Sequence, residues 1–304
     1  NCHIHAKIED KIKFIDEYKK EFNVRLLCKC VGIHHSVYYY HLNHQSNSYK
    51  EANDLLDGEI KRIYTESKGR YGSPKITQKL RQLGFTVSQK RVSRRMKSLG
   101  LRSITIKKYN HAGTSKCDEQ KEYPNLLEQD FNSEKPSEKW VGDITYIYTY
   151  ETGWTYLAIV MDLFDLKVVG WAYGKNMTDD LVIEAFKKAM KKRGLNKDGI
   201  FHSDRGSQYT SNDFEELLEK LNVNHSYSKK GYPYDNASME SFNSILKKEE
   251  VNANNYQTFN EAKLVLFEFI EGWYNNVRIH SSIGYITPNQ KYENYIKELA
   301  CTSI

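Results

Sequence analysis

The segment KWVGDITYIYTY (139–150) decides the fold that we predict for this chain of 304 residues. It is rich in β-branched and aromatic residues, which favour β-strands. Two similar segments follow it, GWTYLAIVMDLFD (153–165) and KVVGWAYG (167–174), and the turn signals ETG and DLK separate the three. We therefore expect three consecutive strands that form an antiparallel meander.

The sequence after this meander alternates helical and strand patterns. Residues 179–194 and 212–222 have amphipathic helical spacing, whereas GIFHSD (199–204) and VNHSYS (223–228) read as short strands. A further helix begins near Asp235, a plausible N-cap. The order βββ-α-β-α-β-α predicts an α/β domain in which helices pack on a mixed sheet.

The composition excludes a membrane-spanning or disulfide-rich protein. No apolar run approaches the length needed to span a bilayer, and the five cysteines are scattered, which suits a reducing compartment such as the cytoplasm. Cys28 and Cys30 lack the spacing of a zinc site, so we interpret them as packed or exposed side chains. The first residue is Asn rather than Met, and we therefore expect a fragment or a processed product.

The net charge of +6 conceals a strong asymmetry along the chain. Residues 61–116 contain 16 Lys or Arg and one acid, Glu66, which gives a net charge of +15, and the remainder carries 29 basic and 38 acidic residues, a net charge of −9. A solvated helix face usually mixes both signs. The excess therefore predicts a polyanion partner, most commonly nucleic acid.

The same basic segment contains a helix-turn-helix pattern. Ser73 and Pro74 begin a helix that stops at Gly84, and Ser88 caps a second helix that ends at Gly100. We predict that the second helix contacts DNA through its basic face, which carries Lys90, Arg91, Arg94, Arg95 and Lys97. The alternative is a plain helical hairpin with a soluble basic face.

We divide the chain into four parts. Residues 1–50 form an N-terminal helical region, in which CVGIHHSVYYYHL (30–42) reads as a short turn and a helix. Residues 51–115 form the helix-turn-helix domain, and 116–135 form a linker. Residues 136–304 form the α/β domain with a helical tail.

Three acids lie next to apolar residues, where a charged carboxylate is unfavourable unless it is paired or bound to a metal. Asp143 lies in the first strand, Asp204 follows the apolar end of the fourth strand, and Glu240 lies on the helix after the fifth. If the first and fourth strands are neighbours, the ends of these two strands converge, and the helix that carries Glu240 can lie across them. Three carboxylates without Cys or His at ligand spacing suit Mg²⁺, with Mn²⁺ as a substitute. Ordinary surface acids and helix caps are the alternative.

Glu240 belongs to a polar stripe on its helix. Asn236, Glu240, Asn243 and Lys247 share one face, opposite an apolar face. His202 alternates with Asp204 on its strand, so it either sits beside the metal or is a packed histidine. Arg278 follows an apolar helix, and we favour a role in bracing the Glu240 helix over contact with DNA.

These motifs resemble those of the insertion-sequence-three family of transposases, within the retroviral-integrase superfamily. The resemblance is carried by WVGDITYI (140–147), HSDRGSQYTS (202–211), GYPYDNASMESF (231–242) and WYNNVRIHSSIGYITP (273–288). Further upstream, GRYGSPKI (69–76) resembles the helix-turn-helix segment of this family and LLCKCVGIHHSVYYY (26–40) its upstream helical motif.

The resemblance implies a ribonuclease-H-like fold in which a five-stranded mixed sheet is flanked by helices and preceded by the helical region. It implies that Asp143, Asp204 and Glu240 hold two Mg²⁺ ions and catalyse cleavage of element ends, which frees a 3′-hydroxyl for joining to a second DNA. Lys247 matches a position that contacts DNA, with Asn243 beside it, and Asn236 and Arg278 would lie around the metal ligands.

The implied partners are double-stranded DNA, as terminal inverted repeats and target, and further copies of the chain, at least a dimer. Full fusion transposases of this family also carry a first-frame portion with a zipper, which we expect to be absent because no heptad run is present. Two rival functions remain, a structure-specific nuclease that does not join DNA and a catalytically silent DNA-binding regulator. The intact acidic triad argues against the regulator.

Overall fold

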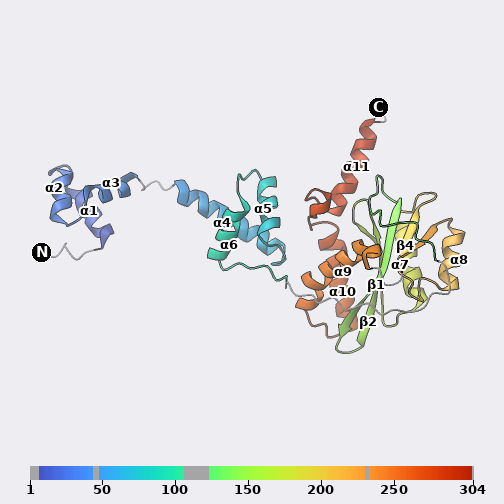
Figure 1. Cartoon of the computed structure of the whole chain (residues 1–304). Helices are drawn as coiled ribbons and strands as arrows, with labels where there is room; N and C mark the ends of the chain where they lie inside the picture. Colours follow the sequence, from blue (N-terminus) through green and yellow to red (C-terminus); the bar gives the residue numbers. More distant parts are fainter. Residues whose placement is uncertain (1–6, 44–47, 106–122, 230–232, 303–304) are drawn as a thin grey trace. The chain divides into compact units, whose positions relative to one another are not determined.

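The computed structural model describes residues 7–43, 48–105, 123–229 and 233–302 (Figure 1). The chain forms two compact units, Asn1–Arg62 and Ile63–Ile304, and the division falls inside helix α4 (Ser48–Glu66). The predicted domain boundaries at 50, 115 and 135 stay a prediction. No helix in the described parts of the chain is long and apolar enough to cross a membrane.

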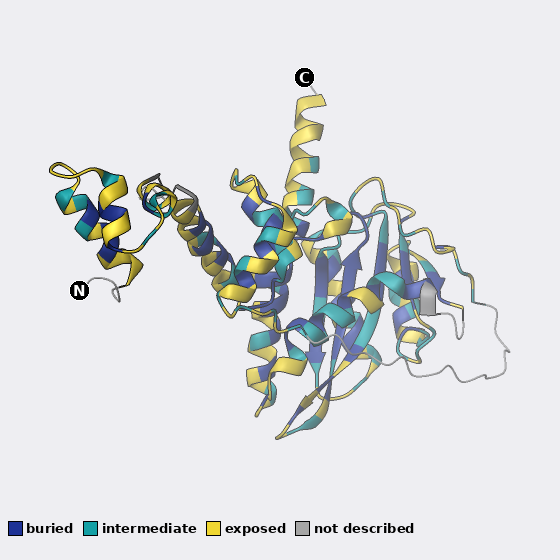
Figure 2. Ribbon diagram, turned by 60° about the vertical axis from the view of Figure 1, so that its left-hand side comes forward, coloured by how far each residue is buried: buried dark blue, intermediate teal, exposed yellow. Residues whose placement is uncertain are grey.

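The N-terminal unit contains a bundle of three short helices, α1 (Ile8–Tyr18), α2 (Val24–Cys30) and α3 (His35–Asn43). A buried cluster lies between them, to which α1 contributes Ile12 and Ile15, and α2 and the residues after it contribute Leu27, Cys28, Val31 and Tyr38 (Figure 2). Cys28 is therefore a packed side chain, as the sequence predicts.

The helix-turn-helix prediction corresponds to α5 (Ser73–Gln82) and α6 (Gln89–Ser98). The side chain of Ser88 accepts a hydrogen bond of 3.2 Å from the Arg91 amide, so the predicted cap of the second helix is confirmed. The first helix begins one residue earlier than predicted, because Gly72 rather than Ser73 is its N-cap.

A five-stranded sheet in the order β3-β2-β1-β4-β5 forms the centre of the second unit. The strands are β1 (Lys139–Thr149), β2 (Gly153–Asp162), β3 (Val168–Gly174), β4 (Ile200–Ser203) and β5 (Asn224–Tyr227). β2 pairs antiparallel with both β1 and β3, whereas β4 pairs parallel with β1 and β5 pairs parallel with β4. The predicted meander is confirmed, and β1 and β4 are neighbours, which is the condition for the expected convergence of the acids.

Helices cover both faces of this sheet (Figure 1). On one face, α7 (Asp179–Lys192) and α8 (Asn212–Lys220) enclose a core that includes Trp140, Phe186, Phe201 and Phe214. Gly170 permits the close approach of α7 to β3, because a Cβ atom there would lie 2.3 Å from the Ala185 carbonyl oxygen.

The opposite face of the sheet holds α9 (Ala237–Glu249) over β1 and α10 (Phe259–Phe267) beside β3. A short 3₁₀ turn, η1 (Pro233–Asn236), precedes α9, and another, η2 (Val251–Ala253), follows it. A π-helix, η3 (Glu268–Tyr274), continues α10, and η4 (Ser281–Ile283) leads to the terminal helix α11 (Pro288–Thr302). The predicted fold class is confirmed, a mixed sheet flanked by helices with a helical region before it.

Candidate active site

Asp143 and Asp204 meet on the face of the sheet that α9 covers. Val141 pairs with His202 across the parallel strands β1 and β4. Asp143 and Asp204 each lie two positions further along the chain. Their side chains therefore project to the same side. Asp204 follows the last residue of β4, where the chain leaves the sheet. The topology therefore brings together two acids that lie 61 positions apart in the sequence.

The environment of Asp143 disfavours its charged form. Burial, followed by the negative charge of Asp204, raises the pKa of the Asp143 carboxyl to about 7. The Asn243 side-chain amide donates a 2.7 Å hydrogen bond to its Oδ2 atom, and the charge of Lys247 also favours the carboxylate. The first three turns of α9 thus supply the groups that compensate this charge.

Asp204 is more accessible than Asp143. The residue is exposed, yet the protein around its carboxyl removes enough water to raise its pKa above the ordinary value. Its Oδ1 atom accepts a 2.9 Å hydrogen bond from the Gly206 amide, which fixes the carboxylate at the mouth of the site. A ligand can therefore reach Asp204 from solvent, whereas Asp143 is half-buried.

The polar stripe on α9 faces β1, as its spacing predicts. Asn236 donates a 3.4 Å hydrogen bond to the Gly142 carbonyl, and Asn243 and Lys247 act on Asp143. Glu240 lies between these residues on the stripe, but its side chain is exposed. In the parts of the chain that the structure describes, no three His, Cys, Asp or Glu side chains are grouped to hold a metal ion.

The residues present nevertheless fit a divalent cation. The negative charge of Asp204 disfavours the charged form of Asp143, and a cation between the two carboxylates would relieve this effect. Both carboxylates are hard oxygen ligands. Among the described residues, the buried Oδ1 atoms of Asn236 and Asn243 have no hydrogen-bond partner, so each leaves an oxygen acceptor unsatisfied. Glu240 would need a change of side-chain or helix position to join them, and Gly231 in the loop before it lies outside the described residues.

His202 is a packed histidine. It is fully buried, and both ring nitrogens bond to serine hydroxyls, Nδ1 to Ser226 at 2.8 Å and Nε2 to Ser228 at 3.0 Å. Burial lowers its pKa to about 4, so the ring is neutral near neutral pH. The alternative in which it sits beside the metal as a ligand has no free ring nitrogen to support it.

One residue near the site, Tyr209, was not predicted from the sequence, and another, Asp235, has a different role from the predicted one. Tyr209 is buried, and burial followed by the charges of Asp143 and Asp204 raises its pKa well above the ordinary value. Asp235 does not cap α9 as predicted, since its carboxylate accepts hydrogen bonds from Asn125, Gln129 and the Lys229 amide. The only feature of the sequence that could have indicated Tyr209 is its position inside the SQYTS motif.

The far end of α9 is held by a buried charge network. Arg278 donates hydrogen bonds of 2.8–3.0 Å to the carboxylate of Glu249, the last residue of α9, and Trp273 donates another of 3.1 Å. Burial alone would raise the pKa of Glu249, but Arg278 outweighs it and holds that pKa below the ordinary value. Arg278 therefore braces the helix that carries Glu240, as expected. It does so at Glu249, which lies nine residues after Glu240, and not at Asp143.

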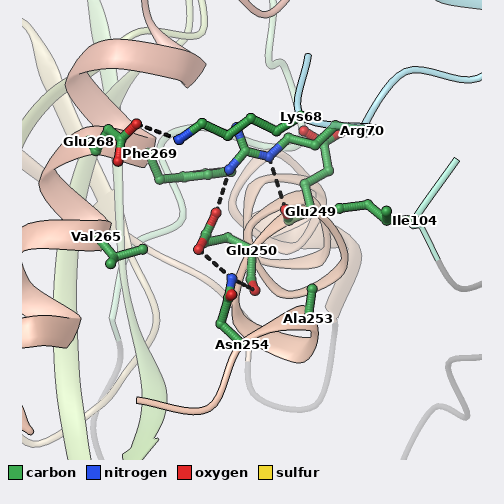
Figure 3. Close-up of a pocket in the computed structure, with 10 residues that line it drawn as sticks. All are labelled: Lys68, Arg70, Ile104, Glu249, Glu250, Ala253, Asn254, Val265, Glu268 and Phe269. Atoms are coloured by element: carbon green, nitrogen blue, oxygen red, sulfur yellow. Dashed lines mark hydrogen bonds and ion pairs between the residues drawn. The ribbon is translucent and has the colours of Figure 1, made fainter. Parts of the chain in front are cut away.

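The helix-turn-helix region contacts this same end of α9. Arg70 bonds to the Glu249 carbonyl at 3.0 Å and to the carboxylate of Glu250, and it lies over the ring of Phe269 (Figure 3). It also lies over the ring of Trp273. A cavity of about 310 Å³ is lined by Arg70, Glu249, Glu250 and Phe269, together with Lys68, Ile104, Asn254 and Glu268. The end of the catalytic-domain helix is thus tied to the chain that leads into α5.

The predicted DNA contacts on α6 lie on its outer surface. Lys90, Arg94 and Lys97 are exposed, whereas Arg91 and Arg95 are half-buried. Asn243, in contrast, directs its amide at Asp143. Contact of any of these residues with DNA stays a prediction.

Comparison with known proteins identifies the family. Models of an integrase core domain match residues 133–233 and 221–288, and a model of an HTH-like domain matches residues 50–109. The transposase for insertion sequence element IS904 of Lactococcus lactis is 39% identical over 246 residues, which cover 80% of this chain and 94% of that protein. Transposase InsF of IS3A from Escherichia coli is 34% identical over 286 residues, 93% and 98% of the two chains. The chain belongs to the IS3 family of transposases.

A solved structure is also similar to this IS3-family chain. The HTLV-2 integrase catalytic core domain in complex with magnesium matches 53% of this chain and 99% of its own, with 22% sequence identity and a TM-score of 0.41. The ribonuclease-H-like integrase fold predicted from the motifs is confirmed for this IS3-family chain by its sheet order and its integrase core match. Integrase-core proteins generally use a divalent metal.

Proposed function

We propose that this transposase cleaves DNA at the ends of its element and joins the freed 3′-hydroxyl to a second DNA, at a site built on Asp143, Asp204 and Glu240. The observation that carries the proposal is the position of Asp204 beside Asp143 under α9, where the negative charge of Asp204 adds to burial in raising the pKa of the Asp143 carboxyl. Such an arrangement destabilises the bare site and favours a bound cation.

Asp143 and Asp204 would hold the cation most directly, and Glu240 would complete the ligand set. Two Mg²⁺ ions, or Mn²⁺ in their place, would supply activation of an attacking oxygen and stabilisation of the leaving oxygen. Asn243 keeps the Asp143 carboxylate oriented through its 2.7 Å hydrogen bond. Lys247, one turn further along α9, places a positive charge beside the path of the phosphodiester backbone.

DNA binding is assigned to the basic surface of α6. Lys90, Arg94 and Lys97 are exposed there and Arg91 and Arg95 flank them, so the helix offers a row of cations to phosphates and base edges. The tie between Arg70 and the end of α9 would hold this DNA-reading region in a fixed relation to the acids. Joining two element ends also calls for at least two copies of the chain.

The test is incubation of the chain with labelled duplex DNA that carries both ends of its element, in Mg²⁺ or in EDTA. We expect cleavage that frees a 3′-hydroxyl and a joined product of higher mass, both lost in EDTA. Cleavage without any joined product would instead support a nuclease. Binding without either product would support a silent regulator, and both outcomes would contradict the proposal.

A matched pair of variants assigns the site. Asp204→Asn removes one ligand charge and should abolish both products while DNA binding persists, because the basic segment lies elsewhere in the chain. Asp198→Asn is the control, since Asp198 is exposed, precedes the same strand and has a left-handed backbone (φ 64°) that Asn tolerates. Substantial turnover by Asp204→Asn in Mg²⁺ would overturn the assignment.

A further inference from the structure

The N-terminal bundle contains a second helix-turn-helix, formed by α2 and α3. The first helix has seven residues, the connection 31–34 has four, and the second helix has nine. Gly32 in that connection has a φ of +68°, and the Ile33 amide bonds back to the Cys28 carbonyl at 3.0 Å. The two helices of a DNA-binding helix-turn-helix are joined by a turn of three or four residues that often contains glycine.

The bundle holds the second helix rigidly. Tyr38 on α3 is buried, and its hydroxyl donates a 2.8 Å hydrogen bond to Asp16 on α1. Asn23 caps α2 through a 2.8 Å bond from the Arg25 amide to its side chain. The other side of α3 is turned to solvent, where Ser36 is exposed and Tyr39 and Tyr40 are 47% and 61% exposed.

The charge distribution of this bundle suits a polyanion. All five acids of residues 7–43 lie between Glu9 and Glu21, whereas residues 22–43 contain Arg25 and Lys29 and no acid. Both cations are exposed on α2, the helix that crosses the phosphate backbone when a helix-turn-helix docks. The polar and aromatic side chains of α3 suit base edges and thymine methyl groups in the major groove.

We propose that α2 and α3 form a second DNA-reading module, in which Ser36, Tyr39 and Tyr40 contact base edges and Arg25 and Lys29 contact phosphates. The HTH-like match begins at residue 50, so this module lies outside it. The chain then carries two readers, α3 and α6, and recognises a two-part duplex sequence. The inference rests on the proposed function, because it assumes that the chain recognises DNA.

The test is selection of duplexes from a random-sequence library by the full chain. We expect the wild-type chain to enrich a two-part motif. Ser36→Ala/Tyr39→Ala/Tyr40→Ala should erase one part, keep the other and weaken binding of the wild-type motif tenfold or more. Arg25→Ala/Lys29→Ala should leave the motif unchanged and reduce the slope of log affinity against log salt by about 1 to 2.

The matched control is Glu9→Ala/Lys13→Ala/Glu17→Ala, which alters three exposed side chains on α1 of the same bundle. It should leave the motif unchanged, and circular dichroism should show that all variants keep their helices. An identical two-part motif after the α3 substitutions would overturn the inference. An unchanged motif with loss of self-association would assign the face to a protein partner, which also overturns it. Failure of the wild-type chain to enrich any sequence would instead contradict the proposed function.

Discussion

The side-chain amide of Asn243 on α9 donates a 2.7 Å hydrogen bond to the carboxylate of Asp143 on β1. The two residues are 100 positions apart, and their bond joins the helix that carries Glu240 to the strand that carries the first acid. Because Asp143 is half-buried and lies near the negative charge of Asp204, this bond is one of the few favourable interactions that its charged form has. The relation between α9 and the sheet therefore controls the ionisation of the site.

Asn243→Ala should reduce strand joining by about ten- to a hundredfold, since a hydrogen bond to a charged group contributes roughly 1.5–3 kcal/mol. Asn243→Asp should reduce it further, because a third carboxylate would face Asp143 and Asp204. Single-turnover assays of the joined product measure both effects. Ser241→Ala, an exposed change on the same helix, is the control. Equal rates for Asn243→Ala and Ser241→Ala would show that the bond has no role in catalysis.

Arg70→Ala should destabilise the second unit by about 3–5 kcal/mol, because it leaves the buried Glu250 carboxylate without its partner. Lys68→Ala removes a neighbouring ion pair with Glu268 that is largely exposed, and it should cost less than about 1 kcal/mol. Urea unfolding of the two variants gives the comparison. Equal midpoints would mean that the Arg70 contact is not a structural tie.

His280 should make the protein less stable in mild acid. Burial, followed by the positive charges of Arg278 and Lys75, lowers its pKa to about 2, while the unfolded chain protonates it near 6.5. The unfolded state therefore binds more protons below pH 6.5, and stability falls as pH decreases through this range, by about 1.4 kcal/mol at pH 5.5.

His280→Gln isolates this contribution, because glutamine does not titrate. Thermal unfolding of the wild type and the variant between pH 7.5 and 5.5 should show a steeper loss for the wild type. Parallel curves would show that His280 is protonated in the folded protein as readily as in the unfolded chain.

The basic face of α6 should account for much of the salt dependence of DNA binding. Arg91→Ala/Arg94→Ala/Arg95→Ala should lower both affinity and the slope of log affinity against log salt, by up to about 0.9 for each lost phosphate contact. Lys187→Ala/Lys188→Ala/Lys191→Ala removes three exposed cations from α7 and serves as the control. A slope lowered equally by both variants would show that α6 is not the principal DNA-contacting surface.

The sequence predicted the strands of the meander and the stripe on α9 because both depend on local residue patterns. The β-branched and aromatic segment 139–149 forms β1, and Asn236, Asn243 and Lys247 act on residues of that strand. Leu83, in contrast, lies at helical spacing from the buried Leu80 but is 51% exposed, since α5 ends at Gln82 and the residue leaves the helical register.

Long-range charge pairing was beyond the reach of the sequence. Glu249 and Glu250 read as two ordinary acids at a helix end, but Arg278 and Arg70 neutralise them from segments 29 and 180 positions away. The π-helical turn of η3, which brings Trp273 to Glu249, also has no local signature. Asp235 was expected to cap α9, but partners in residues 125–129 compete successfully for its carboxylate.

The central claim is that Asp143 and Asp204 form one cation site, which Glu240 completes. Calorimetric titration of Mn²⁺ into the full chain measures this directly, with Asp198→Asn as the control. We predict that the wild type and Asp198→Asn bind Mn²⁺ alike, that Asp204→Asn and Asp143→Asn lose binding, and that Glu240→Gln weakens it. Mn²⁺ binding by Asp204→Asn with the affinity of the wild type would contradict the account.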